Sequence, residues 1–167
     1  GDECVVSLCD QWYLTYGEDQ WKAQTQKLAE NLETYHKSTK ETINYGLGWM
    51  GQWACSRSFG LGSRIPWDEK YLIESLSDST IYMAYYTIAH FLQSNLDGSK
   101  QGLGHIEAKD MTDAVWDYIF MNGPLPETSI PHSTLDAMRQ EFNYWYPFDC
   151  RVTGKDLLIN HCLFSLY

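Results

Sequence analysis

The stretch DCRVTGKDLLINHCLFSLY, residues 149–167, decides the fold that the sequence predicts. DCRV is expected to form a short strand, TGKD a tight turn, and residues 157–167 an apolar helix. A strand, a glycine turn and a helix form the unit with which a parallel α/β sheet presents ligands at the carboxyl end of a strand. The stretch therefore favours a helix-rich α/β fold.

Three residues of this stretch are candidates for ligand contact. Gly154 would allow an unusual backbone conformation or the close approach of a ligand, and Asp156 could accept hydrogen bonds from ribose hydroxyls. From spacing alone a turn glycine and a capping aspartate are the more ordinary interpretation. His161, on a mostly apolar helix, is likewise more often a satisfied core residue than a ligand. TGKD is not a Walker loop, because it lacks the preceding glycine-rich run and the Ser or Thr after the lysine.

A second stretch, LIESLSDSTIYMAYYTIAH at residues 72–90, predicts a helix over about 78–93 that is apolar on nearly every side. Such a helix is normally buried in a sizeable protein or a membrane. Ile81–Leu92 is too short to cross a bilayer, which needs about 20 residues. The pattern alone leaves open what buries this helix, and Ser77 or Asp78 is its candidate N-cap.

Residues near the start of this helix are candidates for a pocket. Ser79 and Tyr82 are three positions apart and would share one helical face. With Leu76 just before them, they could line a small apolar pocket with polar tips. Core packing with a helix cap is the more ordinary interpretation of the spacing.

The remaining segments predict further helices and loops. Before residue 72 we expect a strand buried on both faces at 4–14, an amphipathic helix from Glu18 to Ile43, and a strand or loop system at 49–68. After residue 93 we expect a polar and variable loop near 94–111 and a short helix at 111–120. A further helix is expected to open with a capping box of Ser133 and Asp136. The last helix carries the apolar residues Leu135, Met138 and Phe142.

Composition limits the classes of function. With 44% hydrophobic and 20% charged residues, the 167-residue chain has globular values and the length of one domain. Its net charge is 12 − 22 = −10, and its lysines and arginines form no basic stripe that could track a phosphate backbone. The chain is therefore not expected to grip nucleic acid by itself.

The five cysteines are odd in number and lack zinc-type CxxC spacing. They predict free thiols in a reducing, intracellular compartment and no metal held by this chain. No signal peptide or membrane span is expected. The chain starts at Gly1 without Met and ends inside a predicted helix, so we expect a piece of a longer polypeptide.

Three long segments resemble a known family: ECVVSLCDQWYLTYGEDQWK, ACSRSFGLGSRIPWDEKYLIESLSDSTIYMAYYTIAH and FNYWYPFDCRVTGKDLLINH. In this order they resemble the cytosolic, eukaryotic/archaeal-type leucyl-tRNA synthetase family. The resemblance implies a class I synthetase whose Rossmann-type catalytic domain is split by a large editing insertion. Residues 1–167 would be the C-terminal part of that aminoacylation domain, following the insertion. The half that carries the HIGH signature, the editing insertion, the KMSKS loop and the anticodon-binding domain would lie outside the chain.

The resemblance also implies a leucine pocket. LSDSTIY resembles the bacterial pattern Phe-Val-Asp-Ser-Ser-Trp-Tyr, whose members contact the substrate leucine, and this match points to Leu76, Ser79 and Tyr82. TGKDLLINH resembles Gly-Gly-Ile-Glu-His followed later by a second His. By that match His161 would close the leucine pocket.

The same second match implies a nucleotide contact. Gly154 and Asp156 would meet the ribose region of the adenylate. The bacterial family's first His is replaced by Leu157 here, which removes a polar side chain at that position.

The implied activity is that of a leucine–tRNA ligase in the cytoplasm: leucine and ATP form leucyl-adenylate, and the leucyl group then passes to tRNA-Leu. ATP would be a substrate, with Mg in the complete enzyme, and the partners would include the rest of the polypeptide and, in many animals, a multi-synthetase complex. Neither GHIE at 104–107 nor KSTK at 37–40 replaces the missing HIGH and KMSKS signatures. The chain alone is therefore expected to be inactive, and to supply positioning groups rather than a catalytic acid or base.

Two other classes of function stay open. One is a non-catalytic leucine-binding or scaffold module with a synthetase-like fold, which a start Met just upstream and a stop after Tyr167 would favour. The other is an aromatic-rich sugar-binding module, suggested by the 15% aromatic content. That second class is usually built from all-β repeats, whereas this chain is expected to be mostly helical.

Overall fold

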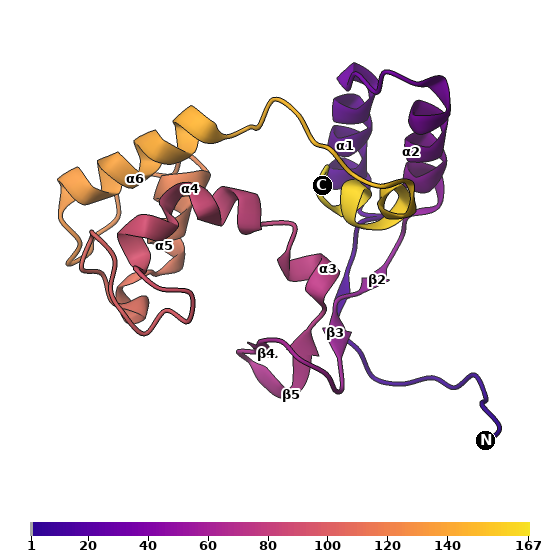
Figure 1. Cartoon of the computed structure of the whole chain (residues 1–167), viewed down its shortest axis with the longest axis horizontal. Helices are drawn as coiled ribbons and strands as arrows, with labels where there is room; N and C mark the ends of the chain where they lie inside the picture. Colours follow the sequence, from indigo (N-terminus) through magenta and orange to yellow (C-terminus); the bar gives the residue numbers. More distant parts are fainter. Residues whose placement is uncertain (1) are drawn as a thin grey trace. The chain divides into compact units, whose positions relative to one another are not determined.

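The computed structural model describes residues 2–167, which form two compact units (Figure 1). Unit 1 consists of residues 2–80 together with 152–167, and unit 2 is residues 81–151. Unit 1 is thus discontinuous in sequence, and its two parts flank unit 2 along the chain. The fold is helix-rich with small sheets, which fits the predicted α/β class at this coarse level.

Unit 1 contains two helices of 13 residues each, α1 (Asp19–Asn31) and α2 (Lys37–Trp49). The sequence predicted one helix across this region. The helix is instead interrupted at 32–36, where Tyr35 has a positive φ of 56° that no α-helix accommodates. The side chain of His36 then accepts a hydrogen bond at the start of α2.

The strands of unit 1 are short and antiparallel. β1 (Tyr13–Leu14) pairs with β2 (Trp53–Ala54), and a second sheet has the order β3 (Ser56–Arg57), β5 (Asp68–Ile73), β4 (Arg64–Ile65). The predicted strand or loop system at 49–68 is thereby confirmed.

The predictions of a strand buried on both faces at 4–14 and of a short strand at 149–152 are wrong. Only Tyr13 and Leu14 of the segment 4–14 pair, and residues 149–152 form no strand. A strand buried on both faces needs neighbours on both sides, and no described residue joins 2–12 in a sheet. Val6 and Leu8 are consequently fully exposed.

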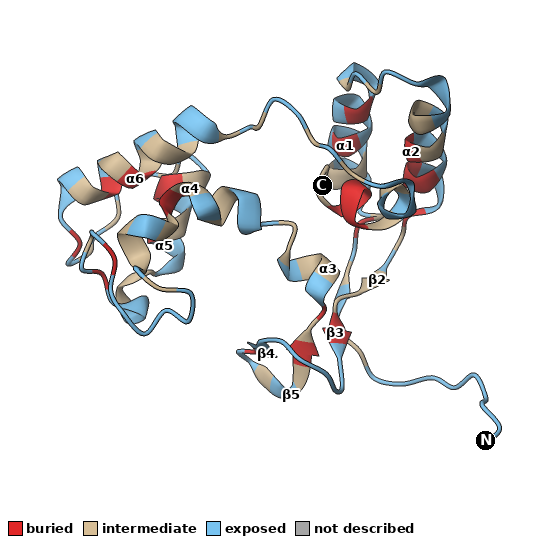
Figure 2. Cartoon of the chain, viewed as in Figure 1, coloured by how far each residue is buried: buried red, intermediate tan, exposed pale blue. Residues whose placement is uncertain are grey.

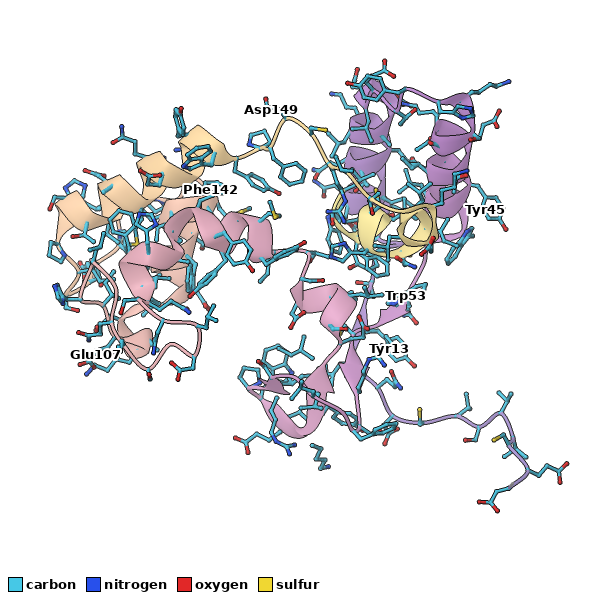
Figure 3. All side chains as sticks on the ribbon, viewed as in Figure 1. Tyr13, Tyr45, Trp53, Glu107, Phe142 and Asp149 are labelled. Atoms are coloured by element: carbon cyan, nitrogen blue, oxygen red, sulfur yellow. The ribbon has the colours of Figure 1, made fainter. Side chains whose placement is uncertain are left out.

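The core of unit 1 lies between α1, α2 and the C-terminal turns (Figures 1 and 2). Its buried members are Tyr16, Ala29, Ile43, Leu47, Met50, Leu163 and Phe164. A Cβ added to Gly46 would lie under 3.0 Å from a methyl group of Leu163, so the glycine lets α2 approach the C-terminal segment closely. Tyr45, by contrast, is exposed and points away from this core (Figure 3).

Contacts between aromatic rings join the two parts of unit 1, residues 2–80 and residues 152–167. Tyr16 stacks on Phe164 with ring centroids 5.2 Å apart, and Trp21 meets Tyr167 edge-on at the same separation. The indole N–H of Trp21 also donates to the carbonyl oxygen of Tyr167 at 2.9 Å. Such pairs add stabilisation beyond the area that they bury.

Unit 2 consists of α4 (Tyr82–Leu92), the 3₁₀ turn η1 (Ala108–Asp110), α5 (Asp113–Phe120) and α6 (His132–Trp145). Its buried core residues are Ile88, Ile106, Val115, Tyr118, Ile119, Ile130, Leu135 and Met138. The apolar residues Leu135 and Met138 of α6 are fully buried, and Phe142 packs against this core. The short helix predicted at 111–120 is also confirmed.

The apolar helix predicted at about 78–93 differs from expectation in extent and burial. It is divided into α3 (Ser75–Asp78) and α4, and of the residues of α4 only Ile88 is buried. Tyr86 remains 62% exposed. This chain therefore does not itself enclose the helix.

The predicted helix caps are wrong. Pro131 precedes α6, and no side chain caps its first turn. Asp136 instead accepts a hydrogen bond from the hydroxyl of Tyr118 and lies 3.4 Å from Nε2 of His132. Neither Ser77 nor Asp78 caps α4, which has Ile81 at its N-cap and no side-chain cap, whereas Glu74 caps α3.

The polar loop near 94–111 is ordered by hydrogen bonds to the end of α4. Gln93 and Gln101 form a β-bridge, and the backbone N–H of Gly102 donates to the carbonyl of Leu92 at 3.0 Å. A Cβ on Gly102 would lie 2.5 Å from the carbonyl oxygen of His90, so only glycine fits there. None of the helices within residues 2–167 has both the length and the apolar character needed to span a bilayer.

Candidate functional site

Two predicted site residues, Ser79 and His161, meet in unit 1. Ser79 follows α3, and His161 lies in η3 (Leu158–Cys162), a turn of π-helix. Their side chains approach to 2.8 Å between Oγ and Nε2, a hydrogen bond whose direction depends on the imidazole tautomer. Two segments that are 82 positions apart in sequence are thus joined by a polar contact.

His161 is held on several sides. It is only 5% exposed, and its backbone N–H donates to the side-chain oxygen of Asn160 at 2.5 Å. Its carbonyl accepts from the backbone N–H and the hydroxyl of Ser165, at 3.1 and 2.7 Å. The residue is therefore buried, as the ordinary interpretation expects, and also engaged in the polar contact that a site would need.

Leu76 lies on α3 and packs against the aromatic core of unit 1. Next to it, Oγ of Ser77 is buried and has no hydrogen-bond partner among the residues described. A buried hydroxyl without a partner carries an energetic cost of about 1–3 kcal/mol. This turn thus combines apolar surface with an unsatisfied polar group.

Glu74 fixes the start of α3. Its side chain is nearly buried, and one carboxylate oxygen accepts from the backbone N–H groups of Leu76 and Ser77, at 2.7 and 3.1 Å. The other oxygen accepts from the guanidinium of Arg57 on β3, at 2.7 Å. The carboxylate thereby joins the sheet to the helix that carries the candidate residues.

A second acidic side chain lies on the same turn. Partial desolvation raises the pKa of the Asp78 carboxyl, a hydrogen bond from the backbone of Ser79 opposes this rise, and the charge of Glu74 adds to it. The carboxyl groups of Glu74 and Asp78 are therefore close enough to interact electrostatically.

Tyr82 occupies the first position of α4, in unit 2, where its ring meets that of Tyr86 edge-on at 5.4 Å. The predicted helical face shared by Ser79 and Tyr82 is wrong, because α3 ends at Asp78 and a new helix begins at Tyr82.

Gly154 and Asp156 lie at the turn before His161. Gly154 has φ −79°, which any residue can adopt, so the expected special backbone conformation is wrong. A Cβ there would meet only Oδ1 of Asp156, at 3.9 Å, and the position is open. Asp156 is exposed within the 3₁₀ turn η2 (Lys155–Leu157), with a carboxylate that faces solvent.

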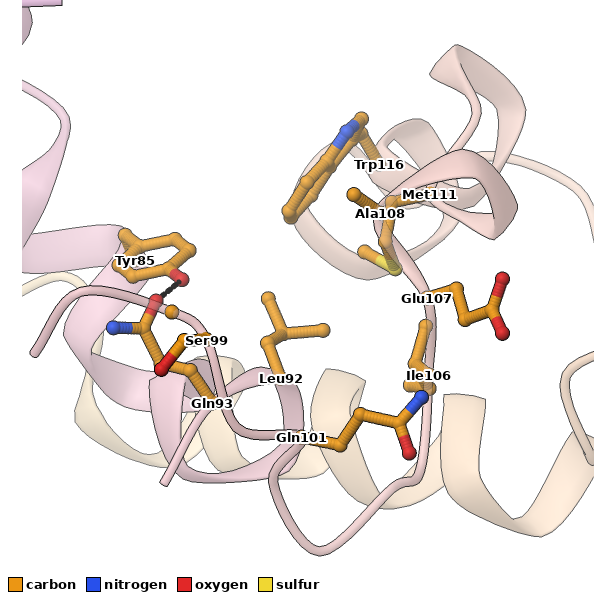
Figure 4. Close-up of a pocket in the computed structure, with 11 residues that line it drawn as sticks. Tyr85, Leu92, Gln93, Ser99, Gln101, Ile106, Glu107, Ala108, Met111 and Trp116 are labelled. Atoms are coloured by element: carbon orange, nitrogen blue, oxygen red, sulfur yellow. Dashed lines mark hydrogen bonds between the residues drawn. The ribbon is translucent and has the colours of Figure 1, made fainter. Parts of the chain in front are cut away.

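A separate cavity of about 500 Å³ lies within unit 2 (Figure 4). It lies between the end of α4, the polar loop and Trp116 of α5, and the hydroxyl of Tyr85 donates to the side chain of Gln93 at its edge. None of the predicted site residues lines it.

The residues that could ligate a metal are dispersed. Within residues 2–167 no three His, Cys, Asp or Glu side chains gather in a way that could hold a metal ion. The five cysteines, Cys4, Cys9, Cys55, Cys150 and Cys162, form no disulfide with one another.

Comparison with known proteins gives matches along the entire chain. It is 57% identical to a cytoplasmic leucine–tRNA ligase of Dictyostelium discoideum and 48% identical to that of Saccharomyces cerevisiae, over 100% of the chain in both cases. It is 54% identical to that of Pongo abelii over 99% of the chain. The resemblance to leucine–tRNA ligases is confirmed. No family model matches the chain.

The match covers one segment of each ligase. The chain spans 16% of the Dictyostelium ligase, 14% of the Pongo ligase and 15% of the Saccharomyces ligase. It thus corresponds to a piece of about the same relative size in each of these leucine–tRNA ligases.

The sequence pattern did not indicate Glu74 and Arg57 as residues of this site. Ser77 and Asp78 are common N-cap types, whereas the side chain that caps α3 is that of Glu74, which precedes both. A glutamate before a polar helical turn was an available signal, since acidic groups favour helix N-termini. Nothing in the local sequence could have indicated Arg57, because it lies across the sheet, 17 positions away.

Proposed function

We propose that the chain is part of the aminoacylation site of a cytoplasmic leucine–tRNA ligase, a class I aminoacyl-tRNA synthetase specific for leucine. The reaction would join leucine and ATP into leucyl-adenylate with release of pyrophosphate, and then transfer the leucyl group to tRNA-Leu. The observation that carries the proposal is identity of 48–57% to such ligases along the whole chain. The chain would belong to a Rossmann-type catalytic domain, following the editing insertion.

Leu76, Ser79, Tyr82 and His161 would form part of the leucine pocket. Support comes from the contact between Ser79 and His161, which joins the two segments that the resemblance assigns to this pocket. The hydrogen bond would hold the imidazole in one orientation, so that its ring closes the pocket over the leucine side chain. Leucine offers only apolar area, so such a pocket gains about 1–3 kcal/mol per discriminating methylene. A complete ligase would therefore need the separate editing site.

Gly154 and Asp156 would contact the ribose of the adenylate. The open space where a Cβ of Gly154 would lie leaves room for a ligand to approach the backbone. The exposed carboxylate of Asp156 is available to accept hydrogen bonds from two adjacent hydroxyls.

Catalysis would rest on positioning and on stabilising phosphate charge, rather than on an acid or base in this chain. ATP would be a substrate. The dispersal of acidic side chains in residues 2–167 does not fit a magnesium site, so any Mg²⁺ would be held elsewhere in the complete enzyme. Because HIGH and KMSKS would also lie elsewhere, we expect the isolated chain to be inactive. The complete ligase could further join a multi-synthetase complex.

The test compares the complete polypeptide that contains this chain with the chain alone, by leucine-dependent exchange of pyrophosphate into ATP. We expect exchange from the complete protein only, and His161→Ala should raise its KM for leucine about tenfold. His132→Ala is the matched control, because His132 is an exposed histidine in unit 2.

Three results would count against the proposal. Exchange by the isolated chain would refute its dependence on the missing parts, and exchange that depends on another amino acid would refute the substrate. Leucine binding by the complete protein without any exchange would instead favour the non-catalytic leucine-binding module.

A further inference from the structure

Glu74 lies where a strand turns into a helix, at the junction of β5 and α3. Its backbone is fixed by a hydrogen bond from its N–H to the carbonyl of Cys55, at 2.8 Å. Its own carbonyl accepts from the backbone N–H groups of Ser77 and Asp78, at 2.9 and 3.2 Å. The main chain of this one residue is therefore tied to the neighbouring strand region and to α3 at once.

The side chain repeats this arrangement. It is 6% exposed, and both carboxylate oxygens accept hydrogen bonds, one from Arg57 and the other from the start of α3. Arg57 pairs with Leu72 in the sheet, so the sheet register sets where the guanidinium lies. A buried carboxylate is tolerated only when it is paired in this way, and hydrogen bonds to charged groups are stronger than neutral ones.

The helix that Glu74 caps depends on such help. α3 has only four residues, and a helix of that length is unstable without contacts outside itself, because nucleating the first turn is unfavourable. Contacts outside the helix come from Leu76 in the aromatic core and, directly after the helix, from Ser79 against His161. A shift of the first turn would therefore move both residues.

We infer that Glu74, held by Arg57, is a positioning residue of the leucine subsite, because its carboxylate sets where Leu76 and Ser79 lie relative to His161. The inference rests on the proposed function and adds to it a residue that supports the pocket through α3. Arg57 is the partner that orients the carboxylate, with 59% of its side chain exposed.

The test uses the complete polypeptide and measures the KM values for leucine and ATP and the kcat of pyrophosphate exchange. In Glu74→Gln the amide nitrogen must face a donor, either Arg57 or the backbone of α3, since both carboxylate oxygens now accept. We expect the KM for leucine to rise about tenfold and the KM for ATP to stay within about twofold. Glu74→Asp keeps the charge and is a good cap, so it should return the KM for leucine to within about threefold of the wild type.

Glu69→Gln is the matched control. It makes the same change on the same strand at an exposed carboxylate, and all kinetic constants should match the wild type. Active-site titration of each variant separates a positioning defect from a folding defect. A purely structural defect would reduce the fraction of active protein, which lowers the apparent kcat and leaves both KM values unchanged. That outcome, or a wild-type KM for leucine in Glu74→Gln, would overturn the inference.

A second variant covers loss of folding. If Glu74→Gln does not fold, Arg57→Met removes the tether at a largely exposed position, and the KM for leucine should rise about threefold. An unchanged KM in this variant would overturn the inference. Failure of the proposed function is recognised separately, since the wild-type protein would then show no leucine-dependent exchange and the inference would fall with it.

Discussion

The close approach of α2 to the C-terminal segment gives a quantitative prediction. Gly46→Ala places a methyl group under 3.0 Å from Leu163, which is fully buried and lies two positions after His161. Alanine in a helix gains about 1 kcal/mol over glycine, whereas overpacking a core costs about 1–3 kcal/mol. The net expectation is a loss of about 0–2 kcal/mol in the free energy of unfolding.

The reciprocal change tests the cause. Leu163→Ala should cost about 2–5 kcal/mol, because it empties a fully buried site. In the double variant the methyl group added at position 46 enters that space, so the two losses should combine to about 1–2 kcal/mol less than their sum. Gly48→Ala is the control: it lies on the same helix, its Cβ would meet nothing within 4 Å, and it should be stabilising and additive with Leu163→Ala.

Urea unfolding of the chain, followed by tryptophan fluorescence, measures these differences. Trp21 and Trp53 pack against the same core and report on unit 1. If Gly46→Ala stabilises the chain as much as Gly48→Ala does, and its effect adds to that of Leu163→Ala within about 0.5 kcal/mol, the steric argument is wrong.

Three further predictions concern pH, the loop and the nucleotide. Burial raises the pKa of Tyr16 from 10.0 to about 12, so the folded state keeps the hydroxyl proton to a higher pH than the unfolded state does. The resulting stability is complete below pH 10 and is lost as the pH rises towards 12. Urea unfolding at about pH 8 and about pH 11.5 should show that Tyr16→Phe lacks this loss. Gly102→Ala should destabilise unit 2 by about 3 kcal/mol or more in thermal unfolding, since the new Cβ meets backbone rather than a movable side chain. Gly154→Ala should have the same unfolding free energy as the wild type, because its Cβ has room. If the adenylate approaches this backbone, the variant should raise the KM for ATP of the complete protein about tenfold. An unchanged KM for ATP would count against that contact.

Sequence predicted the helices better than the strands, for a physical reason. Local sequence indicated the helices α5 and α6, whose residues Leu135 and Met138 lie in the core, since one face of a helix is defined by residues three or four apart. A buried parallel strand depends on partners that are distant in sequence, and neither 4–14 nor 149–152 finds such partners among the described residues. The break at Tyr35 was hidden because the apolar spacing continues across it.

The site was predicted unevenly. Spacing alone favoured core roles for Ser79 and His161, and only the resemblance placed them in one pocket, since a contact across 82 positions leaves no local pattern. The ordinary interpretation was correct in part, because His161 is buried. Glu74 was missed because its role depends on Arg57 and on a helix of four residues, too short for a periodicity to be visible.

The discontinuity of unit 1 has a consequence for synthesis on the ribosome. α1 and α2 are synthesised early, but their core is completed only by Leu163 and Phe164. The first part of unit 1 ends at Thr80, so these two residues follow it by 163 − 80 = 83 residues or more. At about 5–20 residues per second this delay is roughly 4–17 s. The contiguous unit 2 can bury its apolar residues during that interval, whereas the apolar face of α2 stays uncovered. The order of translation therefore leaves the core-facing side of the nascent α1–α2 pair uncovered until Leu163 and Phe164 have been synthesised.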